Sequence, residues 1–181
     1  MLFRSIPVDG RDLSGSTAMH HAISTKPSFD PEFAQILYDA GADVNARNRY
    51  GETAVFDAGK IFNPKDFGST KKASSAIEWF LKHGGNLDLK ENDGWSARAT
   101  LLRSREVFIT LGGSVAKEMY AMIDREDKRR QGDVKCCLFC GMEREDTPVM
   151  TCSRCKSVRY CRAPRDCQKR DWPNHKQKCK K

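Results

Sequence analysis

With 181 residues, of which 39% are hydrophobic, the chain has room for one ordinary domain and a small module, or for a short repeat array and a module. No stretch approaches the roughly 18 consecutive apolar residues of a membrane-spanning helix, so we expect no membrane span and no membrane partner. The formal net charge of +8 lies in residues 135–181, which carry 13 basic and 5 acidic side chains, whereas basic and acidic residues are equal in number in residues 1–134.

The first residues, Met1–Pro7, lack the apolar stretch of about 7–15 residues that marks a secretory signal peptide. We therefore expect an intracellular protein, and the sequence does not choose between nucleus and cytoplasm. Because thiols stay reduced inside cells, closely spaced cysteines there bind metal more often than they form disulfides.

A weak repeat runs through roughly residues 10–110. The segment Gly15–Ala22 is echoed by Gly51–Ala58 and, more faintly, by Gly94–Ala99. Two further segments match each other, Gly41–Asn45 and Gly84–Asp88, and their first glycines suit the left-handed position that ends a helix. Gly41 and Gly84 are 43 residues apart, and so are Gly51 and Gly94.

These strings resemble the ankyrin repeat, whose unit of about 33 residues is a turn followed by two helices. The resemblance implies a mainly α fold for residues 1–113, with two recognisable units and a degenerate third, and a face that holds a second protein. The extra length places a loop at Ile61–Ser69. His20 falls at the histidine of the ankyrin signature, so we interpret it as a residue that bonds the neighbouring turn and not as a catalytic base.

A further helix is predicted over Ser114–Arg130, in a capping or linking segment 114–135. Its apolar residues at helical spacing are Ala116, Met119, Tyr120 and Ile123. We expect this helix to cap the repeats or to bridge them to the C-terminal segment 136–181. Its densely charged end, Asp124–Arg130, is predicted to face solvent.

Four pairs of candidate metal ligands lie in residues 136–181. They are Cys137 with Cys140, Cys152 with Cys155, Cys161 with Cys167, and His175 with Cys179. Zinc takes four thiolate or imidazole ligands tetrahedrally, and a closely spaced pair lets one turn supply two of them. Eight ligands fit two zinc ions, and Cys136 is left over as a rival first ligand. Because every coordination position would be filled by protein, and no HExxH motif is present, we expect structural zinc and no enzyme.

The same segment contains Arg159-Tyr160-Cys161, followed by a C-Q-x3-W-x2-H-x3-C string that starts at Cys167. This combination resembles the MYND-type zinc finger. The resemblance implies interleaved sites. One zinc ion would be held by Cys137, Cys140, Cys161 and Cys167, and the other by Cys152, Cys155, His175 and Cys179. The family usually places three residues between its fifth and sixth cysteines, and here there are five, a wider loop that can still close on one ion.

MYND fingers bind short proline-rich peptides, and the resemblance places the peptide-binding residues at Ser153, Gln168 and Trp172. An indole face packs against proline rings, while polar side chains bond to the carbonyls of an extended peptide. Trp172 also suits the core of a very small domain. We therefore interpret the chain as an adaptor that binds a proline-rich segment of another protein.

The alternative is a nucleic-acid-associated zinc protein that uses the basic C-terminal face. Lysine and arginine also screen anionic zinc–thiolate centres, and no base-reading helix or aromatic stacking platform accompanies the charge. We favour the adaptor.

Overall fold

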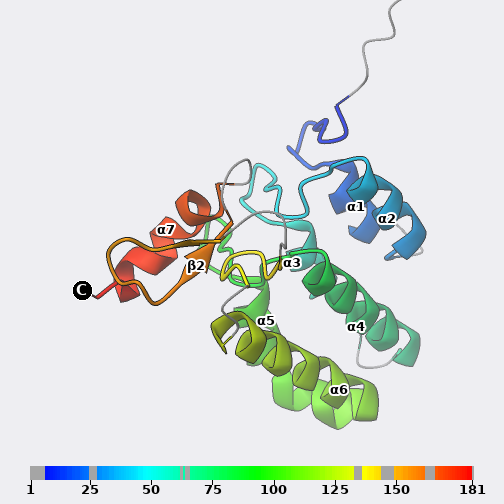
Figure 1. The fold of residues 1–181 in the computed structure, drawn as a ribbon. Coiled ribbons are helices and arrows are strands. Elements are labelled where there is room, and N and C mark those ends of the chain that lie inside the picture. The colour runs from blue at the N-terminus through cyan, green and yellow to red at the C-terminus, as the bar shows by residue number, and fades with distance from the viewer. Residues whose placement is uncertain are drawn as a thin grey trace, which may run out of the picture.

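The computed structural model describes residues 7–24, 28–61, 63, 66–132, 136–143, 149–161 and 166–180. Over these residues the fold is mainly α-helical, as predicted, with one small antiparallel sheet (Figure 1). The helices are α1 (Ala18–Ser24), α2 (Pro31–Asp39), α3 (Ala54–Ala58), α4 (Phe67–Lys82), α5 (Ala97–Arg103), α6 (Arg105–Gly132) and α7 (Cys167–Lys178), and the strands are β1 (Met150–Thr151) and β2 (Arg159–Tyr160). No helix in the described part of the chain is long and apolar enough to cross a lipid bilayer.

Helices α1 to α6 form three consecutive pairs that stack beside one another (Figure 1). One continuous apolar core runs between them and includes the buried residues Ile23, Val55, Ile77 and Leu101. Repeat units of this kind cannot bury their apolar faces alone, so each pair depends on its neighbour.

The same turn precedes each helix pair, including the third, whose sequence is the least regular. The side chain of Asp12, Asn48 or Glu91 accepts hydrogen bonds from the backbone N–H groups two and four residues ahead, with one oxygen in the first two turns and with both carboxylate oxygens of Glu91 in the third. Backbone hydrogen bonds connect each turn to the next. Arg49 N donates to Ser14 O at 2.8 Å, and Asn92 N donates to Tyr50 O at 2.9 Å. The turns therefore form a continuous ladder beside the helices.

His20 bonds the neighbouring unit, as the sequence predicted. Its Nδ1 accepts from Thr17 N at 3.1 Å, and its Nε2 donates to the carbonyl oxygen of Glu52 at 3.1 Å. The predicted helix-ending glycines also have left-handed backbones, with φ of 93° at Gly41 and 88° at Gly84.

The loop predicted at Ile61–Ser69 was placed too far along the chain. Helix α4 begins at Phe67, because the side chain of Asp66 caps it by accepting from Gly68 N at 2.9 Å. Of the predicted loop, Phe62, Pro64 and Lys65 lie outside the described residues.

Helix α6 contains the predicted helix Ser114–Arg130 but starts earlier, at Arg105, and Gly113 interrupts it with a non-helical φ of 57°. Its four predicted apolar residues are buried and belong to the core shared with α4. The prediction that its charged end faces solvent is confirmed for Asp124, Arg125 and Lys128 but was wrong for the residues that dock the finger. The side chains of Glu126 and Arg130 are only 14% and 9% exposed, because they pair with each other under the cysteine-rich segment.

Candidate metal centres

Two groups of four metal-ligating side chains come together in the C-terminal part of the structure. Site 1 consists of Cys137, Cys140, Cys161 and Cys167, and site 2 consists of Cys152, Cys155, His175 and Cys179. Within each group, the four candidate ligand atoms all lie within 4.8 Å of one another. This is the interleaved arrangement that the resemblance to the MYND finger implied.

Short turns and one helix position these ligands. Cys137 and Cys140 lie in a turn that is closed by a hydrogen bond from Gly141 N to Cys137 O at 2.8 Å. A similar turn after β1 presents Cys152 and Cys155. Helix α7 begins at Cys167, carries His175 in its last turn, and is followed directly by Cys179. It therefore contributes to both sites and is fixed at both ends.

The distances between ligand atoms fit tetrahedral zinc. Four thiolates about 2.3 Å from one zinc ion are separated by about 3.8 Å along the edges of the tetrahedron. The Sγ atoms of Cys140 and Cys161 are 3.6 Å apart in site 1, and those of Cys152 and Cys179 are 3.9 Å apart in site 2. His175 Nε2 lies 3.4 Å from Cys152 Sγ. The two sites can therefore hold two zinc ions.

The electrostatics of site 1 also favour a divalent cation. Hydrogen bonds from Cys140, Cys161 and Cys167 hold the pKa of Cys137 well below its ordinary value. The same contacts with Cys137 raise the pKa of Cys140 and of Cys167. The pKa of Cys161 is lowered, so two of the four thiols favour the thiolate form and two oppose it. A bound cation removes that conflict by balancing the charges of the thiolates.

The five-residue gap before Cys167 does not separate it from its partner. Residues 162–165 lie outside the described part of the chain, yet Cys161 and Cys167 belong to the same four-ligand group. Cys136, the rival first ligand, belongs to neither group. Its buried Sγ donates to Gly141 O at 3.3 Å, and burial raises the pKa of its thiol to about 11.

Tyr160 fills the space between the metal-binding segments and α7. Its side chain is fully buried, its hydroxyl donates to Asp171 Oδ2 at 2.7 Å, and its ring meets that of His175 edge-on at 5.9 Å. Burial raises the pKa of Asp171, although the hydrogen bond from Tyr160 opposes this. Asp171 was missed in the sequence because a carboxylate on a charged helix gives no signal of burial.

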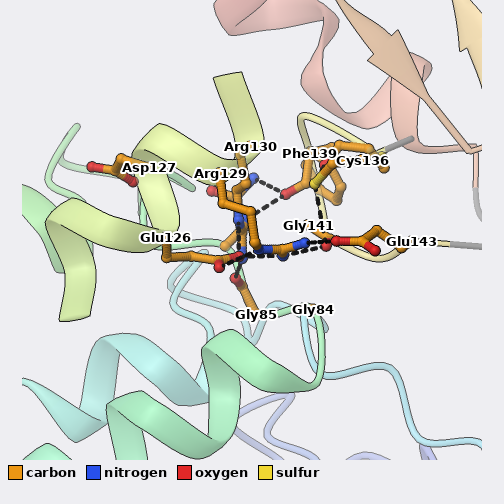
Figure 2. Close-up of polar contacts among 12 residues, drawn as sticks. Gly84, Gly85, Glu126, Asp127, Arg129, Arg130, Cys136, Phe139, Gly141 and Glu143 are labelled. Carbon is orange, nitrogen blue, oxygen red and sulfur yellow. Dashed lines mark hydrogen bonds and ion pairs between the residues drawn. The ribbon is translucent and has the colours of Figure 1, made fainter. Parts of the chain in front are cut away.

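The cysteine-rich segment docks onto the repeats around the turn of site 1. Asn86 Nδ2 donates to Phe139 O at 2.8 Å. Arg130 donates to the same oxygen at 3.2 Å and to Gly85 O at 3.0 Å (Figure 2). Arg129 donates to Gly141 O and pairs with Glu143 at 2.6 Å (Figure 2). Side chains of the repeats and of α6 therefore satisfy the carbonyl oxygens of a metal-binding turn.

A second docking contact comes from α7. Arg170 forms an ion pair with Asp43 at 3.1 Å, donates to Asn45 O at 2.9 Å, and lies over the ring of Phe139 at 5.1 Å. None of these docking residues was predicted from the sequence.

The three predicted peptide-binding residues are all accessible, and two of them share a surface. Gln168 and Trp172 are one turn apart on α7. Gln168 is half-buried and Trp172 is 39% exposed. The centre of the Trp172 ring lies 6.0 Å from that of the His175 ring. Ser153 is exposed in the turn between Cys152 and Cys155. Among the described residues, no hydrogen bond or ring contact links Ser153 to the other two.

Comparison with protein families identifies both parts of the chain. Residues 137–179 match the MYND finger, and residues 14–49 match the ankyrin repeat. No curated protein matches the chain. The chain thus contains a zinc-binding MYND finger next to an ankyrin-type stack, and both are typically non-catalytic modules of protein–protein interaction.

Proposed function

We propose that this protein is a non-enzymatic adaptor whose finger binds a short proline-rich segment of another protein beside Trp172, while the repeats hold a second protein. The observation that carries the proposal is the large exposed indole on α7, a helix that ligands of both metal sites hold in place. An aromatic face fixed in this way is a preformed surface for the rings of an extended proline-rich peptide, and little entropy is lost when it binds.

The polar groups beside the indole suit the same ligand. Gln168, one turn before Trp172, can donate to a peptide carbonyl, and so can the exposed hydroxyl of Ser153 next to site 2. An extended proline-rich peptide leaves its own carbonyls without internal partners, so such donors add affinity and direction.

The turn ladder supports the second interaction. Each of the three turn segments carries one large exposed apolar side chain, and these are Leu13, Tyr50 and Trp95. Since the turns are hydrogen-bonded to one another, the three side chains are held in a fixed order along the ladder. We place the second protein partner on this face.

The location we propose is intracellular, because eight reduced cysteines, seven of them grouped for metal binding, suit a reducing compartment. We assign no reaction to the protein, since all ligand positions of each site are supplied by the chain and a catalytic zinc ion keeps one position open.

The experiment starts with a phage-displayed library of proline-containing peptides, which is selected on the zinc-loaded protein. A selected peptide is then labelled with fluorescein and titrated by fluorescence anisotropy. We expect Trp172→Ala to weaken binding about tenfold or more, as for a tryptophan at the centre of an interface. Trp95→Ala is the matched control, because this indole is similarly exposed but lies before α5, and it should leave the affinity unchanged.

Two outcomes would count against the proposal. One is selection of no proline-containing peptide, and the other is equal binding by the Trp172→Ala variant. If the protein instead binds a DNA or RNA duplex with an affinity that falls steeply with salt, the nucleic-acid alternative is supported.

A further inference from the structure

We propose that Cys155 is a site of oxidation by hydroperoxides, through which site 2 loses its metal ion while site 1 retains its own. The two sites have the same number of ligands but differ in access and in what holds their turns in place. This inference concerns the metal sites alone and stands independently of the peptide and protein partners proposed above.

Access to solvent distinguishes the two sites. The four thiols of site 1 are between 0% and 3% exposed. In site 2, Cys152, His175 and Cys179 are buried, but Cys155 is only partly buried. Cys155 also lines a cavity of about 350 Å³, together with Val158 of the hairpin and Asn174 of α7. Cys155 is therefore the ligand residue of the two sites that is most open to a small oxidant in solution.

The turn of site 1 is held by groups outside the finger. Phe139, which lies between two ligands of site 1, accepts hydrogen bonds at its carbonyl from Asn86 and Arg130. Gly141, directly after the second ligand, accepts from Arg129. To expose these thiols, the finger must first separate from α6 and from the repeats.

The hydrogen bonds that hold the turn of site 2 are local. Cys152 N donates to Val158 O, Lys156 N donates to Cys152 O, and Ser157 Oγ donates to Cys155 O, each at 2.9 Å. All these groups belong to the hairpin that carries the turn. None of these hydrogen bonds reaches the repeats or α6, so they can open while the docking hydrogen bonds of the site 1 turn persist, and site 2 is the site that opens at lower free energy.

A hydroperoxide is the two-electron oxidant of this reaction. The Cys155 thiolate attacks one oxygen of hydrogen peroxide, the O–O bond breaks, and hydroxide leaves, so that a sulfenic acid is formed. The Cys152 thiolate then attacks the Cys155 sulfur, an S–S bond forms, and the sulfenic oxygen leaves as a second hydroxide. Two thiolates have lost two electrons, and peroxide has gained them. Only His175 and Cys179 remain as ligands of site 2, which is too few to retain zinc.

The test follows zinc release from the full zinc-loaded chain after addition of hydrogen peroxide, with the chromogenic chelator 4-(2-pyridylazo)resorcinol in solution. We expect one equivalent of zinc to be released first and the second about tenfold more slowly or slower still, because buried ligands react only after local opening. Samples taken after the first phase are alkylated with N-ethylmaleimide and mapped by mass spectrometry. A disulfide between Cys152 and Cys155, with the four site 1 thiols reduced, is the expected product.

Two matched variants assign the fast phase. Cys155→His keeps a zinc ligand at this position but removes the oxidisable thiol, so we expect two bound zinc ions and no fast phase. Cys140→His makes the same exchange in site 1 and should leave the fast phase in place. Should either variant bind fewer than two zinc ions, the order of cysteine oxidation in the unaltered chain decides the question.

Three results would overturn the proposal: release of both zinc ions at one rate, oxidation of site 1 cysteines first, or a fast phase that persists in Cys155→His.

Discussion

The side-chain amide of Asn86 donates a hydrogen bond of 2.8 Å to the carbonyl oxygen of Phe139, which lies 53 positions further along the chain. A bond of the same type and length joins the first two repeat units, from Asn45 Nδ2 to Gly84 O. Asn86 N completes the series by donating to Asn45 Oδ1 at 2.8 Å. The asparagine contacts that link one repeat to the next thus continue into the metal-binding turn, and the finger occupies the end of this series.

Replacing Asn86 should therefore weaken the attachment of the finger. In Asn86→Ala the buried carbonyl of Phe139 loses its shorter hydrogen bond, and the Oδ1 acceptor of the Asp88 backbone N–H is also lost. We expect the free energy of unfolding to fall by about 1–3 kcal/mol, the range for loss of a buried hydrogen-bonding partner. Urea denaturation of the zinc-loaded protein measures it. The control is Asn92→Ala, which removes an exposed side-chain bond to Arg49 O and should cost about 0.5 kcal/mol or less.

The ion pairs of Glu126 are predicted to matter far more than a neighbouring pair on the same helix. Glu126→Gln leaves Arg130 without its carboxylate partner and Arg129 with Glu143 alone, and we expect a loss of about 2–4 kcal/mol. Glu118→Gln removes an exposed partner of Arg125 and should change the stability by less than about 1 kcal/mol. Equal effects of the two substitutions on urea denaturation would contradict this prediction.

The same carboxylate sets the sign of a pH effect. Burial alone would raise the pKa of Glu126, but hydrogen bonds from Arg129 and Arg130 outweigh it and hold the pKa below the ordinary value of 4.5. A carboxyl group whose pKa is lowered by folding stabilises the folded state above its unfolded pKa, and this contribution is lost as the pH falls through the folded pKa. The stability difference between the unaltered protein and Glu126→Gln should therefore be largest above pH 4.5 and shrink on acidification.

Alanine substitutions at two equivalent glycines distinguish the cost of backbone strain from the cost of disturbing the docked finger. Gly41 and Gly84 both have positive φ, so alanine at either should cost about 1–2 kcal/mol. A Cβ atom at Gly41 meets nothing within 4 Å, whereas one at Gly84 lies 3.2 Å from Cys140 O and 3.3 Å from Met142 Cγ. We expect Gly84→Ala to lower the melting temperature clearly more than Gly41→Ala does. Similar melting temperatures would mean that the finger does not press on this loop in solution.

Adjacent cysteines should differ in their effect on zinc content. Elemental analysis of the reduced protein is expected to give two zinc ions per chain, and Cys137→Ser should reduce this to one, because it removes a ligand of site 1. Cys136→Ser should retain both, since its thiol donates to the backbone carbonyl oxygens of Cys137 and Gly141 and belongs to neither ligand group. A loss of zinc in Cys136→Ser would identify it as a ligand in place of its neighbour.

Ligand spacing and the repeated glycine and asparagine strings were enough to predict the zinc chemistry and the class of fold. Each of these signals is local, since a few residues at fixed intervals specify one turn or one site. The start of α6 was not predicted, because Val107 and Leu111 are apolar but exposed. The apolar residues of this part of the helix therefore do not recur along one buried face at helical spacing.

The docking of the finger could not be predicted for a different reason. Arg170 lies 127 positions from Asp43, and Arg130 lies 45 positions from Gly85. No motif relates such residues, and a charged side chain looks the same in a sequence whether it faces water or a buried carbonyl oxygen. Only the packing of α6 against the stack decides which of its charges become buried.

The two attachments of the finger, by Asn86 and Arg130 at one turn and by Arg170 at the other side, also determine how the protein would present two partners. A module on a flexible tether samples many orientations, and the effective concentration of its partner depends on the length of the tether. Here hydrogen bonds and an ion pair attach the finger to the repeats, so the indole on α7 and the ladder of turns are held in one arrangement. A ternary complex built on this protein would have its geometry fixed before either partner arrives.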